Sequence, residues 1–276
     1  MEAEEAFHRS DTVIMPVGTL HGHGPTPIGI DASSVDRLAD AVGEKTGLVT
    51  LPLLPYGEND KMRDYPGSIT ITQQTLEAVY TDICRSLRRN GIRKVIFLNG
   101  HGGNREPLIR AGRNIRELGM LAAVLEWWTI GRTLMPSFFS AGSHIVELAV
   151  ALAIGGPEMA DLRSGGYKGE WGIHPPLRRL FGEKIVPLGF NNFEYAGAQL
   201  IIPVDAWDID VESPPELARD ELQELQRQGE EAIDRLVEYI SEFATEFQKV
   251  DVATALERPR MPEVRRPTSL RMRSSV

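Results

Sequence analysis

The chain has 276 residues, of which 42% are hydrophobic and 25% charged, and a formal net charge of −9. This composition is ordinary for a globular protein, and the negative charge argues against nucleic acid as the main partner. A single cysteine excludes an intramolecular disulfide and fits a reducing compartment. No stretch reaches the ~18 uninterrupted apolar residues of a membrane span, and the acidic opening MEAEEAFHRS does not resemble a signal peptide. We therefore predict a cytoplasmic protein with no membrane partner.

The first part of the chain alternates short apolar strands with helices. We predict strands over 12–17 and 48–55, and between them a helix over 33–47 with a serine cap and a glycine stop. Apolar residues then recur every three or four positions over 72–90, which predicts a second helix. The stretch 94–99, KVIFLN, is the clearest buried strand.

The alternation continues after that strand. A glycine-rich loop opens a helix that stops at Gly119, and a further strand is predicted over 120–127. An apolar helix is predicted over 143–156. A looser segment then leads to a long charged helix over 213–248, with prolines at its start, where proline is tolerated.

Strand–helix alternation of this kind predicts an α/β fold, with a mostly parallel sheet flanked by helices on both faces. We expect one domain over 1–250. The arginine- and proline-rich tail over 251–276 has little periodicity and is predicted to be extended or to pack on a neighbouring subunit. Ligands bind beyond the carboxyl ends of the strands in such sheets, and both TLHGHG and NGHGGN fall there.

The stretch HGHG holds the first candidate metal ligands. His21 and His23 project to the same side if the backbone is extended, because side chains alternate along a strand. Together with Asp31 they form half of a site for zinc, manganese or iron. The alternative, that these are loop histidines bonded to backbone, stays open at this point.

Two later motifs add candidates. His101 lies between glycines directly after a buried strand, where the backbone allows another group to approach closely. In SHIVE, His144 and Glu147 lie on one face of an apolar helix, where a charged glutamate requires a partner. A salt bridge at the helix end is the alternative role for Glu147.

These fragments together resemble a known family. VIMPVG, HGHGP with the following aspartate, YGENDKMRDYPGSITI, VIFLNGHGGN and AGSHIVELAVAL occur in the order of the creatininase (creatinine amidohydrolase) superfamily. The resemblance runs from Thr12 to the long C-terminal helix. It implies a three-layer α/β sandwich, a divalent metal centre, a small-molecule substrate, and a homo-oligomer, which in this family is often a hexamer.

The resemblance also implies a set of metal ligands. Carried over position by position, these are His23, Asp31, His101 and Glu147, with Asp31 bridging two ions. The family usually has a glutamate where this chain has His21. The implied cofactor is one or two ions of zinc, manganese or iron, and the loss of one negative charge at His21 favours zinc or leaves one metal position weak.

The substrate-binding part of the pattern departs further. The family often has a histidine where this chain has Gly142, and His144 follows two residues later. Creatinine itself is therefore not the expected substrate. His144 and Glu147 are the predicted catalytic residues, and Glu58 or Asp60 is an alternative proton carrier. The predicted substrate-binding residues are Lys61, Tyr65, Asn104, Trp127 and Trp128, although the two tryptophans are equally compatible with the core.

Three functions remain in competition. The first is a metal-dependent hydrolase in which a metal-bound hydroxide attacks the carbonyl of a small cyclic or amide-type substrate. The second is hydrolysis of a carbon–carbon bond in a cyclic diketone such as 3-dehydro-scyllo-inosose. The third is a non-catalytic, metal-free binding protein.

Overall fold

The fold is described from a computed structural model. It covers residues 2–22, 26–64, 67–140, 143–156, 182–189, 192–204, 217 and 219–257. The predicted site residues His23 and Tyr65 lie outside this described part, as do Gly142 and the end of the tail, 258–276. The backbone of His144 is described but its side chain is not.

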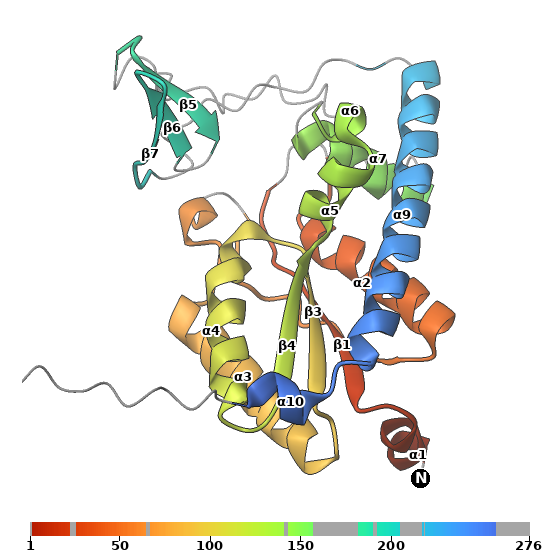
Figure 1. The fold of residues 1–276 in the computed structure, drawn as a ribbon. Helices are drawn as coiled ribbons and strands as arrows, with labels where there is room; N and C mark the ends of the chain where they lie inside the picture. Colours follow the sequence, from red (N-terminus) through yellow and green to blue (C-terminus); the bar gives the residue numbers. More distant parts are fainter. Residues whose placement is uncertain are drawn as a thin grey trace, which may run out of the picture.

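A four-stranded parallel sheet forms the centre of the fold (Figure 1). Its order is β2-β1-β3-β4, and β1 and β3 pair over their full length, from Thr12 opposite Lys94 to Val17 opposite Asn99. The strands are β1 (Thr12–Val17), β2 (Val49–Thr50), β3 (Lys94–Asn99) and β4 (Leu121–Glu126). The predicted parallel sheet is confirmed.

Helices cover both faces of this sheet. On one face lie α2, α7 and α9, and on the other lie α3 and α4 (Figure 1). The helices are α1 (Glu2–Arg9), α2 (Ile30–Thr46), η1 (Asp60–Met62), α3 (Gln73–Arg89), η2 (Gly102–Asn104), α4 (Arg105–Arg116), α5 (Trp127–Leu134), α6 (Pro136–Phe139), α7 (Ser143–Gly155), α9 (Arg219–Gln248) and α10 (Val252–Leu256).

The alternation of side chains along β1 and β3 divides the core into two layers. Ile14 and Ile96 pack with α2, α7 and α9, whereas Val13, Val95 and Phe97 pack with α3 and α4. A strand that is apolar at every position belongs in a sheet buried on both faces, which is what TVIMPV and KVIFLN encode. This confirms the three-layer sandwich.

Helix α2 begins one turn earlier than the serine cap predicted. Gly29 is its N-cap, and the hydroxyls of Ser33 and Ser34 instead donate to the carbonyls of Ile30 and Asp31, both at 3.4 Å. The turn that starts at Pro27 already places the next residues in helical hydrogen bonding. As a result, Asp31 lies in the first turn of α2, where the helix dipole favours a negative charge.

Two further predictions need correction. Of the strand predicted over 48–55, only Val49–Thr50 forms a continuous strand, and after it Leu54 pairs with Val17 in an isolated bridge. The prolines in LPLLP interrupt the ladder because they have no N–H to donate. The stretch after α7 was expected to be loose, yet it holds an antiparallel sheet of β5 (Ile185–Gly189), β6 (Asn192–Tyr195) and β7 (Ala198–Ile201).

The start of the predicted tail is helical. α10 is capped by Asp251, whose carboxylate accepts from the N–H groups of Ala253 and Thr254. Over the residues that can be described, no helix has the length and apolarity needed to cross a membrane. Cys84 is buried on α3, and burial raises its thiol pKa to about 12, which fits a structural role.

Lys94 fastens the end of α9 to the sheet. It is 3% exposed, and its ammonium donates to the carbonyls of Gln248 (2.5 Å) and Val250 (3.1 Å) and pairs with Asp11 (3.1 Å). Lys94→Met leaves these acceptors without a donor. We expect it to lower the free energy of unfolding in urea by about 2–3 kcal/mol.

Lys45→Met is the matched control for this substitution. Lys45 pairs with Glu238 on the surface, where both side chains are about half exposed. Such pairs contribute at most about 1 kcal/mol. Equal urea midpoints for the two variants would contradict a fastening role for Lys94.

Candidate metal centre

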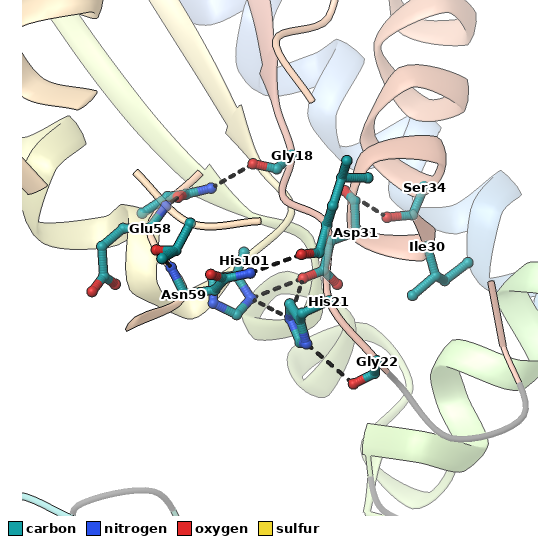
Figure 2. A network of polar contacts seen from close by, with 12 residues as sticks. Gly18, His21, Gly22, Ile30, Asp31, Ser34, Glu58, Asn59 and His101 are labelled. Atoms are coloured by element: carbon teal, nitrogen blue, oxygen red, sulfur yellow. Dashed lines mark hydrogen bonds and ion pairs between the residues drawn. The ribbon is translucent and has the colours of Figure 1, made fainter. Parts of the chain in front are cut away.

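Three segments meet at the carboxyl edge of the parallel sheet (Figure 2). His21 follows β1, His101 follows β3, and Asp31 lies in the first turn of α2. Since β1 and β3 are neighbours in parallel register, the residues after them emerge at the same edge.

The three side chains converge through one atom each. His101 Nδ1 lies 2.8 Å from Asp31 Oδ2, and His21 Nε2 lies 3.1 Å from both of these atoms. His21 is 1% and Asp31 3% exposed, whereas the His101 side chain is 17% exposed. The cluster is thus shielded from water, with access on the His101 side.

The donor set fits a divalent ion. His21 Nδ1 lies 3.1 Å from the carbonyl of Gly22, so the ring proton is best placed on Nδ1 and the lone pair of Nε2 faces the cluster. Two imidazole nitrogens and a carboxylate oxygen are typical ligands of zinc, manganese or iron. Their separations of about 3 Å are those of ligands at roughly right angles around an ion with bonds of ~2.1 Å, as in octahedral coordination, and are shorter than the ~3.4 Å of a tetrahedral site.

Gly100 permits this convergence. A Cβ at this position would lie 2.0 Å from the carbonyl oxygen of Asp31. The loop after β3 therefore passes directly against the first turn of α2, and this contact brings His101 to Asp31. A larger residue at position 100 would have to separate the two ligands.

Asn104 ties the surrounding loops together. Its Oδ1 accepts from the N–H of Glu58 (2.9 Å) and its Nδ2 donates to the carbonyl of Gly18 (3.1 Å). The side chain is completely buried and links these loops, and its predicted role in substrate binding stays a prediction.

Glu58 is a partly buried acid beside this loop. Burial raises the pKa of its carboxyl, against the opposing effects of the Asp60 backbone and of the nearby His101 and Lys61. Its carboxylate packs over Gly103, where a Cβ would lie 2.3 Å from Glu58 Oε2. Lys61, predicted to bind substrate, is half-buried in η1 of the same loop.

The other predicted site residues that the structure describes are not part of this three-residue cluster. Glu147 is half-buried on α7 and is not one of the ligands within 4.8 Å of one another. Trp127 is 3% exposed and packs edge-on against Trp128 and Phe139, in the core position that the sequence left open as an alternative. Trp128 is partly buried against the same core.

The sequence did not single out Asn59, which is 2% exposed and linked to Leu20, directly before His21. It lies between two acids in GENDK, and no local pattern distinguishes it from them. Its hydrogen bond joins it to Leu20, 39 positions away in the chain, so only the fold shows that Asn59 lies next to the segment that carries His21.

Comparisons with known proteins agree with the fold. The family model described as Creatininase: Creatinine amidohydrolase matches residues 1–154. Creatinine amidohydrolase of Pseudomonas putida is 30% identical over 141 residues, which are 46% of this chain and 54% of that protein.

Two other curated relatives carry different activities in their names. The mycofactocin precursor peptide peptidase of Mycolicibacterium smegmatis is 32% identical over 39% of this chain and 46% of that protein. The 3-dehydro-scyllo-inosose hydrolase of Thermotoga maritima is 31% identical over 37% of this chain and 33% of that protein. The chain thus spans about half or less of the length of the curated relatives it matches.

Solved creatininase structures share the fold over most of the chain. One described as a manganese creatininase has a TM-score of 0.63 at 22% identity and covers 90% of this chain and 96% of that one. A zinc–zinc form of a creatininase variant has a TM-score of 0.61 at 23% identity and covers 90% and 95%.

Proposed function

The chain belongs to the creatininase family, and we propose that it is a metal-dependent hydrolase whose ion is held by His21, Asp31 and His101. The observation that carries this proposal is the convergence of two ring nitrogens and one carboxylate oxygen within 3.1 Å of one another. Without a shared cation or proton, three lone pairs facing one another at this distance are unfavourable. The zinc and manganese named for the related structures are the proposed metals.

Metal binding in this proposal is assigned to named residues of the chain. When bound, a divalent ion would supply Lewis acidity, polarising a carbonyl and lowering the pKa of a water molecule. His21 and His101 bind as neutral rings, and Asp31 contributes the negative charge that the two imidazoles do not. His23 and Glu147 remain proposed additional ligands, and a second ion would depend on them.

Proton transfer is assigned to Glu58 among the described candidates. Its half-buried carboxyl has a raised pKa, which suits a group that must both accept and release a proton. Asp60 is exposed and paired with Arg63 at 3.0 Å, so it is less suited to this role. His144 stays a predicted alternative.

The proposed substrate is a small molecule with an amide or cyclic amide carbonyl. The relatives' names span an amidohydrolase, a peptidase and an inosose hydrolase. Attack of water on a polarised carbonyl carbon can serve all three. Two of the names imply C–N cleavage, which favours an amide, and the third supports carbon–carbon bond hydrolysis of a cyclic diketone as the second candidate. Homo-oligomeric assembly and a cytoplasmic location stay predictions.

Metal analysis followed by a substrate panel tests this function. We expect the purified protein to retain stoichiometric zinc or manganese, and its thermal midpoint to fall when a chelator removes the metal, because an ion that binds only the folded chain stabilises it. Lactams, formamides, short peptides and dehydro-inososes would then be compared for product formation. A protein without bound metal and indifferent to chelator would instead support the metal-free binding protein.

A further inference from the structure

Asn59 has a buried amide oxygen with no hydrogen-bond partner in the described part of the chain. Its amide nitrogen donates to the carbonyl of Leu20 at 2.9 Å, and this bond determines which end of the amide is the oxygen. A buried acceptor without a partner costs about 1–3 kcal/mol. Such an atom indicates an interaction that is completed only in the working protein.

Asn59 lies between the two segments that carry the histidines (Figure 2). On one side it bonds to Leu20, the residue before His21. On the other side, a Cβ at Gly103 would lie 2.1 Å from the backbone oxygen of Glu58, so the chain at 58–59 packs directly against the loop of His101.

The second ring nitrogen of His101, Nε2, requires a hydrogen-bond acceptor when Nδ1 binds a metal. The hydrogen bonds recorded for its ring all involve Nδ1, which faces Asp31 and His21. A ring that ligates through Nδ1 carries its proton on Nε2, and ligating histidines almost always donate that second N–H to an acceptor. His21 already has such an acceptor in the carbonyl of Gly22.

We propose that metal binding through Nδ1 brings His101 Nε2–H into a hydrogen bond with Asn59 Oδ1, a bond that the two groups do not make in this structure, and that this bond then holds the ring in its metal-binding orientation. This makes Asn59 a positioning residue, and the inference rests on the proposed metal site. Glu58 is the rival acceptor, because it interacts electrostatically with His101. Asn59 is favoured because its oxygen is fully buried and unpartnered, whereas the Glu58 carboxylate packs over Gly103.

The Zn²⁺ affinities of three variants of the full chain, measured by competition with a chelator, test this assignment. Asn59→Ala removes the acceptor and is expected to weaken binding by about 10–100-fold. Asn59→Asp keeps an acceptor oxygen but cannot donate to Leu20. We expect its Zn²⁺ affinity to be no more than about threefold weaker than that of the original protein. Glu58→Ala removes the rival acceptor together with a negative charge near His101, and we expect it to weaken binding by no more than about threefold.

Three results would overturn the inference. Unchanged affinity in Asn59→Ala would show that the acceptor is dispensable. Equal losses in Asn59→Ala and Asn59→Asp would assign the effect to the Leu20 bond, and a larger loss in Glu58→Ala than in Asn59→Ala would make Glu58 the acceptor. If the original protein binds no Zn²⁺, that result would instead contradict the proposed function itself.

Nitrogen-15 NMR of the Zn²⁺-loaded, unvaried protein decides the question even if Asn59→Ala does not fold. We expect the His101 ring to bind zinc through Nδ1 and to show a slowly exchanging proton on Nε2, whose resonance shifts in Asn59→Asp. A ring protonated on Nδ1 with zinc on Nε2 would overturn the proposal.

Discussion

Asp31→Asn is expected to weaken Zn²⁺ or Mn²⁺ binding by well over 100-fold and to abolish turnover. Asp31 is the one carboxylate among the three converging ligands, and its Oδ2 contacts both rings. An amide oxygen in its place has no net charge, and the imidazoles cannot replace it. The loss of metal affinity should exceed the ~10–100-fold that is typical of removing a group that hydrogen-bonds to a metal ligand.

Stability measurements separate this effect from misfolding. Asp31 is 3% exposed, so the cost of burying its charge offsets the favourable effect of the helix dipole, and we expect Asp31→Asn to change the stability of the metal-free protein by no more than about 1 kcal/mol. Metal at 100 times its Kd stabilises a folded protein by about 2.7 kcal/mol. We therefore expect metal to raise the urea midpoint of the original protein but not that of Asp31→Asn. A variant that still gains stability from metal would show that Asp31 is not a ligand.

Ser34→Ala is the matched control in the same helix. The Ser34 hydroxyl donates to the backbone carbonyl of Asp31 and does not touch its carboxylate. Its removal should leave metal affinity within about twofold and change stability by about 1 kcal/mol or less. A large loss of affinity in Ser34→Ala would mean that the position of α2, and not the carboxylate, controls binding.

The sequence predicts the parts of this fold that local pattern controls. The strands TVIMPV and KVIFLN are apolar at every position, so they could be assigned to a sheet buried on both faces, and with it the edge where His21 and His101 emerge. Asp31 was a predicted ligand, but its place inside α2 depends on the turn at Pro27–Gly29, which overrides the serine cap signal.

Roles that depend on contacts between distant segments could not be predicted in the same way. Asn104 was named among the substrate-binding residues, and nothing in the sequence indicated that its amide joins Gly18 to Glu58 in the interior. Trp127 carries no local mark that separates a pocket wall from a core residue, and only the packing against Phe139 decides it. Motifs thus pointed to the three side chains that converge, His21, Asp31 and His101, but not to the residues that hold the surrounding loops in place.

Gly100→Ala is expected to disrupt the metal centre without changing any ligand. The added Cβ would lie 2.0 Å from the carbonyl oxygen of Asp31, a backbone atom that cannot rotate away. Relief requires the loop after β3 to move from α2, which separates His101 from Asp31. We expect a loss of about 2–3 kcal/mol in the free energy of unfolding and at least a ~100-fold loss of Zn²⁺ affinity.

Gly102→Ala tests whether this effect is specific to the contact. Gly102 lies in the same loop two residues away, and its added Cβ would meet nothing within 4 Å. The same substitution there should change stability by no more than about 0.5 kcal/mol and leave metal affinity intact. Equal losses in both variants would mean that the loop requires glycine flexibility in general. A loss confined to Gly100→Ala would instead show that the close approach of two backbones sets the distance between Asp31 and His101.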